Sequence, residues 1–250
     1  LYGDGFFESI KVFNKKPFNF ENHYLRIKFS ANYLGLDFNH SKNDFLEMIS
    51  LLINKNEIIN CSIRITIFRS SLGKYYPKED SSSCYITAAK DNNSFFLHSK
   101  EELRIGVYEE NLKSTSAISN LKTLNSLFYV LASKYSRDNN FNDVFLLNTN
   151  KNIIESTNSN FFIIKSGMVF TPPISDGCVD GSMRKLLISI IKNKYDFSTQ
   201  SLSYKQIQDS EEIILSNAIS GVRRVTFFGD KNYMKQDFYN FLIESLNKLI

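Results

Sequence analysis

The stretch that decides the fold is VFLLNTNKNIIESTNSNFFIIKSGMVFT, residues 144–171. Within it, short apolar runs alternate with turns rich in Asn, Lys, Ser and Gly, a pattern typical of short consecutive strands. Four strands are predicted, at residues 144–147, 153–155, 160–164 and 168–171. Immediately upstream, apolar side chains at helical spacing predict an amphipathic helix over residues 123–135: Leu124, Leu127, Phe128, Leu131 and Tyr135. Strands and helices in this arrangement indicate a mixed α+β (α/β) chain.

The residues on both sides continue this mixture. Downstream we expect a buried helix that starts just after Gly181 and includes residues 186–191, strands at 213–215 and 222–227, and a terminal helix through Phe238, Phe241, Leu242, Leu246 and Leu249. Upstream we expect strands at 6–13, 63–68, 84–89 and 103–107 and helices at 21–36 and 44–53, the first helix carrying Leu25, Phe29 and Tyr33 on one face.

A polar segment of small residues at 110–119 is expected to be a linker. We therefore divide the chain into a small α+β domain (1–112), a linker (113–121) and a larger α/β domain (122–250). The chain begins at Leu1 rather than Met, and we expect native sequence to precede it.

The composition excludes several classes of protein. With 42% hydrophobic and 22% charged residues the chain is globular, neither disordered nor a coiled coil. Its net charge of +4 is small and its basic residues are scattered, which argues against a nucleic-acid partner. No apolar run reaches the roughly 18–20 residues of a membrane span. Cys61, Cys84 and Cys178 lack disulfide or metal-ligand spacing, so we expect no metal and a reducing, cytoplasmic compartment.

Two segments of small residues could bind an anion. Asp180-Gly181-Ser182-Met183-Arg184 precedes an apolar helix, whose first amides and dipole favour negative charge, although a cap formed by Ser182 is the simpler local interpretation. Asn217-Ala218-Ile219-Ser220-Gly221 follows a buried strand, where an ordinary turn is again simpler than a ligand loop. The three histidines, His23, His40 and His98, are interpreted as surface, capping or structural residues.

Read together, seven short segments resemble the class IV aminotransferase family, the fold-type IV enzymes that use pyridoxal 5′-phosphate. In chain order they are YGDGFFE (2–8), HYLR with SA (23–26, 30–31), LKTLN (121–125), IESTNSNFF (154–162), TPP (171–173), GSMR (181–184) and NAI (217–219). The resemblance covers nearly the whole chain. It implies the two-domain architecture of the D-amino acid aminotransferases, with residues 122–250 as the cofactor-binding domain.

The resemblance also implies roles for individual residues. Lys122 stands where the family has the lysine that forms an imine with the cofactor aldehyde and later acts as a base. Glu155 stands at the carboxylate that pairs with the pyridine nitrogen, and Arg26 at the phosphate-binding arginine. By the same resemblance, the two small-residue segments become phosphate loops, with Ser182 and Met183 in one and Asn217 and Ala218 in the other.

Departures from the family patterns bear on the substrate. Phe7 stands where D-amino acid aminotransferases carry a tyrosine that helps hold the substrate carboxylate, and phenylalanine cannot donate that hydrogen bond. Lys74 and Tyr76 stand roughly where those enzymes use arginine and histidine, so we take Phe7, Lys74 and Tyr76 as candidate substrate-binding residues. The segments GSMR and NAI look more like 4-amino-4-deoxychorismate lyase, whereas Glu8 is found in many transaminases.

The activity implied first is therefore that of a 4-amino-4-deoxychorismate lyase, which forms 4-aminobenzoate and pyruvate for folate synthesis. The alternative is an aminotransferase for branched-chain or D-amino acids. A non-catalytic paralogue acting as a binding protein is a third possibility, and the presence of Lys122, Glu155 and Arg26 together argues against it. The resemblance further implies a small-molecule amine substrate and a homodimer.

Overall fold

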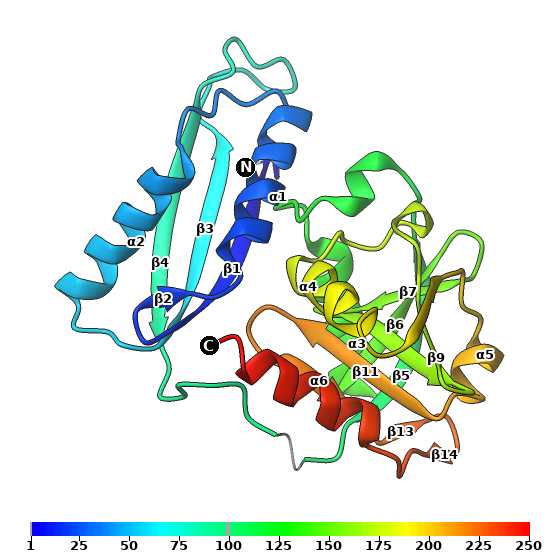
Figure 1. Cartoon of the computed structure of the whole chain (residues 1–250). Coiled ribbons are helices and arrows are strands. Elements are labelled where there is room, and N and C mark those ends of the chain that lie inside the picture. The colour runs from blue at the N-terminus through cyan, green and yellow to red at the C-terminus, as the bar shows by residue number, and fades with distance from the viewer. Residues whose placement is uncertain (1, 99–100) are drawn as a thin grey trace. The chain divides into compact units, whose positions relative to one another are not determined.

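The computed structural model describes residues 2–98 and 101–250, which form two compact units (Figure 1). The first unit consists of the residues up to Phe95 together with Leu121–Asn125 and Ile250. The second consists of Phe96–Asn120 and Ser126–Leu249. Both units combine helices with β-sheet, so the predicted α+β fold class is confirmed.

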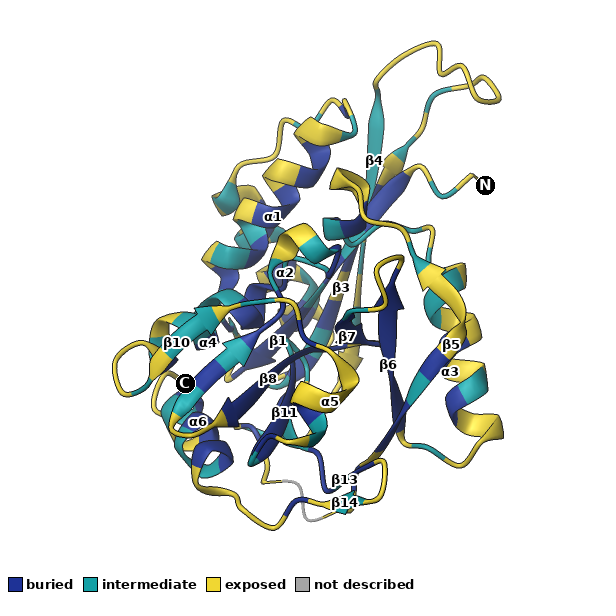
Figure 2. Cartoon of the chain, turned by 90° about the vertical axis from the view of Figure 1, so that its right-hand side faces the viewer, coloured by how far each residue is buried: buried dark blue, intermediate teal, exposed yellow. Residues whose placement is uncertain are grey.

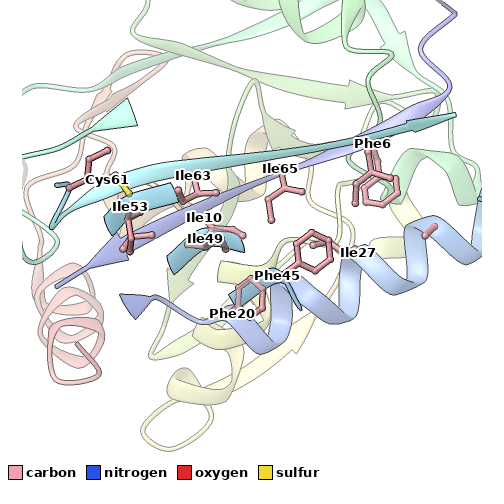
Figure 3. Packing of buried hydrophobic residues seen from close by; sticks show 14 of the residues in the cluster. Phe6, Ile10, Phe20, Ile27, Phe45, Ile49, Ile53, Cys61, Ile63 and Ile65 are labelled. Carbon is pink, nitrogen blue, oxygen red and sulfur yellow. The ribbon is translucent and has the colours of Figure 1, made fainter. Parts of the chain in front are cut away.

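The first unit is an antiparallel sheet with two helices. Its strands lie in the order β2-β1-β3-β4, and its elements are β1 (Gly5–Phe13), β2 (Lys16–Pro17), α1 (Phe20–Tyr33), α2 (Lys42–Lys55), β3 (Cys61–Arg69) and β4 (Ser82–Lys90). Alternate residues of β3 are buried, as expected for a strand with one covered face. Ile63 and Ile65 of that face pack with Ile27 of α1 and with Phe45 and Ile49 of α2 in one core (Figure 3).

The second unit contains two five-stranded sheets. One has the order β14-β13-β5-β6-β7 and the other β10-β9-β8-β11-β12. The strands are β5 (Arg104–Lys113), β6 (Asp143–Asn148), β7 (Ile153–Ser156), β8 (Asn160–Lys165), β9 (Met168–Thr171), β10 (Asp196–Thr199), β11 (Glu212–Asn217), β12 (Gly221–Arg224), β13 (Phe227–Phe228) and β14 (Lys231–Asn232). The helices are η1 (Ala117–Asn120), α3 (Leu127–Asp138), η2 (Ile174–Asp176), α4 (Ser182–Ile191), α5 (Tyr204–Gln208) and α6 (Asp237–Asn247).

The core of the second unit lies where its two sheets contribute side chains to one cluster. Phe145 of β6 and Phe161 of β8 meet there with ring centroids 4.7 Å apart. Figure 2 shows β6, β7, β8 and β11 as buried strands. Ala132 of α3 packs with Val144 and Leu146 of β6 in a second cluster, and α4 and α6 contact β11. The sheets are thus buried between helices, which explains why their strands are apolar runs rather than alternating ones.

Most elements expected from the sequence are present. The four strands predicted in residues 144–171 are β6 to β9, and the helices predicted at 44–53, after Gly181 and at the C-terminal end are α2, α4 and α6. The helix predicted from Thr123 begins instead at Leu127, because the backbone of residues 122–124 bonds to β1. Peptide groups that pair with a strand cannot also form the first helical turn.

The face expected on the first helix is also different. Leu25, Phe29 and Tyr33 are exposed, at 50%, 58% and 45% of their surface, although α1 itself is present. The buried face of α1 carries Ile27 and Ala31 together with polar residues, among them His23 and Arg26. A stripe that mixes polar and apolar residues does not stand out in hydrophobic periodicity.

The division into units departs from the expected domains in two segments. Residues 96–112 were assigned to the small domain, and the structure places them in the second unit, because β5 pairs in parallel with β6 and β13. Leu121–Asn125 were assigned to the linker and the larger domain, and they belong to the first unit because they bond to β1. Within residues 2–98 and 101–250, no helix has the length and apolar character needed to cross a membrane.

Candidate active site

The segment that carries Lys122 is held by the first strand. The backbone N–H of Phe7 donates to the carbonyl of Lys122 at 2.9 Å, and that of Leu124 donates to the carbonyl of Gly5 at 3.0 Å. Gly5 lets this strand approach its neighbour, because a Cβ at that position would lie 2.4 Å from the carbonyl oxygen of Ile67. The backbone of Lys122 is therefore fixed by pairing with a sheet rather than by helix formation.

The ring of Phe7 is in contact with two cationic side chains. The ammonium nitrogen of Lys122 lies 4.5 Å from the ring centroid, and the guanidinium carbon of Arg64 lies 3.8 Å from it. Both distances are within the range of cation–π attraction to the negative face of an aromatic ring. Phe7, predicted to contact substrate, is thus placed beside the predicted catalytic lysine.

Arg26 forms a buried pair with Glu8 of β1. Its Nε donates to Glu8 Oε1 at 2.6 Å and its Nη2 donates to Glu8 Oε2 at 2.8 Å, while Nδ1 of His23 lies 2.6 Å from Glu8 Oε2. Burial by itself would raise the pKa of Glu8, but the charge of Arg26 and the bonds from His23 and Arg26 lower it to about 2. The predicted phosphate-binding guanidinium is therefore anchored by a carboxylate at two of its nitrogens.

Glu155, at 3% exposure, belongs to a buried cluster in the second unit. Lys113 Nζ donates to its Oε1 at 2.6 Å, the hydroxyl of Tyr129 donates to the same oxygen at 2.9 Å, and the amide of Val179 donates to Oε2 at 2.9 Å. Burial and the charge of Glu155 raise the pKa of Tyr129 well above 10, so the phenol stays protonated and acts as a donor. The carboxylate of Glu155 is thus held in place by an ammonium, a phenol and a backbone amide.

The segment predicted to bind phosphate through Ser182 and Met183 forms the start of α4. Gly181 is the N-cap residue and Ser182 the first helical residue, so the interpretation of Ser182 as the cap is wrong. Ser182 and Met183 are each 2% exposed. A Cβ on Gly181 would lie 2.0 Å from Oδ1 of Asn160, so any other residue at the cap would have to displace the Asn160 side chain. The first amides of a helix of this length favour an anion, as the motif implies.

Asn217 ends β11 and shapes the second predicted phosphate segment. Its Oδ1 accepts from the amides of Ile219 at 3.0 Å and Ser220 at 2.8 Å, which closes a turn over Ala218. Its Nδ2 donates to Oγ of Ser159 at 3.1 Å. The side chain of Asn217 therefore builds the turn, and it occupies the amides of Ile219 and Ser220 in doing so.

Lys74 and Tyr76, the other two predicted substrate residues, lie in the exposed loop between β3 and β4. Tyr76 is 84% exposed, and neither side chain forms a hydrogen bond or ion pair with any residue that the structure describes. The contacts within the first unit bring Lys122 and Phe7 together, but they do not join Lys74 or Tyr76 to them.

Sequence reasoning did not identify four residues of these clusters: Glu8, Arg64, Lys113 and Tyr129. Glu8 was noted only as a family difference, yet it shares the buried face of β1 with Phe6 and Ile10, a signal available from the strand alternation. Arg64 similarly alternates with the buried isoleucines of β3. Lys113 stood in the expected linker, and nothing in its local sequence marked it as buried.

Chemically, these clusters supply a lysine amine, a buried carboxyl group and several groups that can donate hydrogen bonds to an anion. Among residues 2–98 and 101–250, no group of three His, Cys, Asp or Glu side chains is arranged to hold a metal ion. Burial raises the pKa of the Cys178 thiol to about 12, so this cysteine is neutral and unreactive. The groups present are those of amine and proton-transfer chemistry.

Comparison with known proteins gives a consistent result. A family model described as amino-transferase class IV matches residues 5–227. The D-alanine aminotransferase of Staphylococcus aureus is 27% identical over 229 residues, which are 90% of this chain and 79% of that protein. A solved protein of Legionella pneumophila, provisionally assigned as 4-amino-4-deoxychorismate lyase, has a TM-score of 0.90 and 26% identity over 99% of this chain and 92% of its own. The branched-chain aminotransferase of Thermoproteus uzoniensis, solved with norvaline, also has a TM-score of 0.90, over 99% of this chain and 85% of its own; at 20% identity it shows the fold alone.

Proposed function

Because the chain belongs to the class IV aminotransferase family, a family of enzymes, we propose that it works with pyridoxal 5′-phosphate and uses Lys122 as its catalytic residue. The observation that carries this proposal is the position of Lys122, whose backbone is bonded to β1 and whose ammonium lies beside Phe7. The bound cofactor would supply an aldehyde that reacts with amines and a ring that accepts the electron pair left on the substrate carbon.

The donor set of the chain fits such a cofactor. Glu155 offers a buried carboxyl group held by Lys113, and a carboxylate is the partner that a protonated pyridine nitrogen requires. Arg26 offers a guanidinium already oriented by Glu8, and the first amides of α4, at Ser182 and Met183, suit a phosphate. Asn217 and Ala218 are assigned on the family resemblance alone, because the Ile219 and Ser220 amides of their turn already donate to Asn217 Oδ1. We assign Arg26, Glu155, Ser182, Met183, Asn217 and Ala218 to cofactor binding on this chemistry and on the family resemblance.

In this proposal each protein group has one task. The amine of Lys122 would take the proton from the substrate carbon that carries nitrogen. Glu155 would hold the ring of the cofactor, while Tyr129 and Lys113 hold the Glu155 carboxyl group in place. Phe7 limits the space beside Lys122.

The activity we propose is that of a 4-amino-4-deoxychorismate lyase. The family patterns at residues 181–184 and 217–219 support it, and Phe7 lacks the hydroxyl expected in a D-amino acid aminotransferase. Glu8, which resembles the transaminases, is buried against Arg26 and His23, so its presence reflects the packing of α1 rather than substrate choice. The second candidate is an aminotransferase, favoured by the similarity to D-alanine aminotransferase. Folate synthesis, a cytoplasmic location and a homodimer follow from the same resemblance and are part of the proposal.

The test is reduction of the cofactor-loaded protein with borohydride, followed by peptide mass spectrometry. We expect a visible absorption band that reduction removes and a cofactor mass fixed on Lys122. The Lys122→Ala variant should show neither, whereas Lys134→Ala, at an exposed lysine paired with Asp138, should behave as wild type. Wild-type protein that never acquires the band or the mass would overturn the proposed cofactor role.

Product analysis then separates the two activities. A lyase releases fluorescent 4-aminobenzoate from 4-amino-4-deoxychorismate without an amino acceptor. An aminotransferase instead requires a 2-oxo acid and converts D-alanine or a branched-chain amino acid. Pyruvate alone does not discriminate, because both the lyase and D-alanine transamination form it.

A further inference from the structure

The carboxyl group proposed to meet the ring nitrogen of the cofactor already has a cationic partner in the chain. Lys113 of β5 and Glu155 of β7 form an ion pair at 2.6 Å, with side chains only 11% and 4% exposed. Glu155 has no other ion pair within residues 2–98 and 101–250. A second cation that enters this site must therefore share Glu155 with Lys113.

The hydrogen bonds of this pair leave room for one more donor. Lys113 Nζ donates to Oε1 of Glu155 at 2.6 Å and to the hydroxyl of Tyr129 at 2.7 Å. Its third N–H donates to the carbonyl of Ser119 at 2.9 Å, so the ammonium is fully used. Tyr129 donates to the same Oε1 at 2.9 Å, and the amide of Val179 donates to Oε2 at 2.9 Å. Because a carboxylate oxygen accepts two hydrogen bonds, the described residues leave one acceptor position free, on Oε2.

The other titratable groups around this carboxyl group do not replace Lys113 as its partner. Burial raises the pKa of the Cys178 thiol to about 12 and that of the Tyr129 phenol well above 10, so both groups are neutral. Asp180 and Arg184, which also act on Cys178, carry charges of opposite sign. The ammonium of Lys113 is therefore the charge with which a bound cation competes.

A cation already bound to a buried carboxylate disfavours a second one, because like charges a few ångströms apart repel strongly where water is excluded. We propose that Lys113 is a positioning residue that shares Glu155 with the cofactor and thereby limits how firmly the ring nitrogen keeps its proton. A ring that holds this proton less firmly withdraws electrons less strongly, so Lys113 sets the electron demand of the site. This inference rests on the proposed function, since it requires the cofactor on Lys122.

The experiment lets pyridoxal 5′-phosphate compete with its 1-deaza analogue, in which a carbon replaces the ring nitrogen. The cofactor-loaded protein is exchanged against a mixture of the two compounds near neutral pH and reduced with borohydride. Peptide mass spectrometry then gives the ratio of the two adducts on Lys122. Both compounds have the same aldehyde and phosphate, so this ratio reports the contact between the ring nitrogen and Glu155. Wild type should favour the natural cofactor.

Removing the competing charge should strengthen this preference. In Lys113→Met and Lys113→Gln the ratio should rise by about 10-fold, which corresponds to a tenfold change in the proton affinity of the ring nitrogen. Lys113→Arg keeps the charge and should retain the wild-type ratio, whereas Glu155→Gln should lose the preference. The matched control is Lys11→Met, because Lys11 is likewise a buried lysine, at 4% exposure, and is paired with Asp91. This control removes a buried ion pair of the first unit and should leave the ratio unchanged.

A second readout is the nitrogen NMR signal of a cofactor labelled in the ring. The signal of the protonated nitrogen should persist to a pH about one unit higher in Lys113→Gln than in wild type. If wild type traps the cofactor but the ratio in Lys113→Gln is unchanged or smaller, Lys113 does not compete for the carboxylate, and the proposed function stands. Loss of trapping in both Lys113→Met and Lys113→Gln would show that Lys113 supports binding as a whole, and this too would overturn the inference. If wild type does not trap the cofactor, the inference and the proposed function both fail.

Discussion

At the scale of single residues, the charged side chain of Glu8 binds α1 to β1. Glu8, with its carboxylate fully buried, accepts hydrogen bonds from Arg26 and lies within hydrogen-bond distance of His23, so three polar residues occupy a position that apolar side chains would otherwise fill. Removing one partner of such a group leaves the others buried and unpaired, which costs far more than losing an exposed pair. Because Arg26 is also a proposed phosphate ligand, Glu8 connects the stability of the first unit to its function.

This arrangement predicts an acid-sensitive fold. Burial opposes the charge of Glu8, but Arg26 and His23 lower its pKa from 4.5 to about 2, so the stabilisation is present above pH 4.5 and is lost as the pH falls toward 2. Over that interval the free energy of unfolding of wild type should decline by about 3 kcal/mol from this group. Glu8→Gln should be less stable at pH 7 by about 3–5 kcal/mol and should lack that decline.

Urea denaturation of the cofactor-free protein at several pH values between about 2.5 and 7 measures both quantities. Asp138→Asn is the control, because Asp138 also has a lowered pKa but lies on the surface beside Lys134 and Arg137, with its side chain 40% exposed, so that solvent screens the pairing. Its stability should follow that of wild type at every pH. Parallel pH profiles for wild type and Glu8→Gln would contradict the assigned role of Glu8.

Among the elements, those defined by a local pattern could be predicted, and those defined by distant pairing could not. The strands at 144–171 and the helices α2, α4 and α6 follow from apolar spacing and turn residues in their own sequence. The apolar spacing from Thr123 onward also predicts a helix, yet residues 122–124 pair with β1. Their conformation is therefore determined by backbone groups that are distant in the sequence. Local periodicity contains no information about such a partner.

The residues of the candidate site also separate into those that sequence motifs predict and those that only the folded structure reveals. Lys122, Glu155 and Arg26 could be proposed from family motifs, whereas Lys113 and Arg64 could not, because only the folded chain brings Lys113 to Glu155 and Arg64 to Phe7. On α1, in contrast, a clear apolar pattern predicted the wrong face of the helix to be buried. Leu25 and Phe29 form a good apolar pattern, but the polar residues on the opposite face are the buried ones, since Glu8 compensates them.

The close approach of β1 to β3 at Gly5 predicts that Gly5→Ala lowers the stability of the protein. In Gly5→Ala the new methyl group would meet the carbonyl oxygen of Ile67 at 2.4 Å and Cα of Phe68 at 2.7 Å, so the two strands must move apart. We expect a loss of about 2–3 kcal/mol in the free energy of unfolding, typical of overpacking. Since the carbonyl of Gly5 also bonds to Leu124, borohydride trapping on Lys122 should fall as well.

Gly35→Ala is the matched control. Gly35 has a φ of +60° but no atom within 4 Å of the added Cβ, so its cost is backbone strain alone, about 1 kcal/mol. Gly35 follows α1 and takes no part in the bonds between β1 and residues 122–124, so Gly35→Ala should leave trapping unchanged. Urea denaturation gives the free energy of unfolding of both variants. If Gly5→Ala is as stable as Gly35→Ala, β1 and β3 accommodate the methyl group without loss of stability, and the prediction is wrong.

For the molecule as a whole, the proposed homodimer must bury apolar surface that a single chain leaves exposed. Leu127, Val130 and Leu131 lie on one face of α3 and are 64%, 58% and 42% exposed. The spacing i, i+3, i+4 makes them neighbours, so they form a continuous apolar stripe rather than scattered surface residues. We assign this stripe to the interface between two copies of the chain.

In a two-fold interface every substitution occurs twice, so a charge placed in the stripe should act strongly. Light scattering coupled to size exclusion should give wild type a mass of twice the 28.9 kDa chain, and Leu127→Asp should shift it toward the single-chain mass. Leu51→Asp is the control, since Leu51 of α2 is equally exposed, at 61%, but is not in the stripe. Wild type that remains at the single-chain mass at micromolar concentration would exclude the dimer. A dimer that tolerates Leu127→Asp but not Leu51→Asp would move the interface from α3 to α2, because the buried charge disrupts association only where two copies meet.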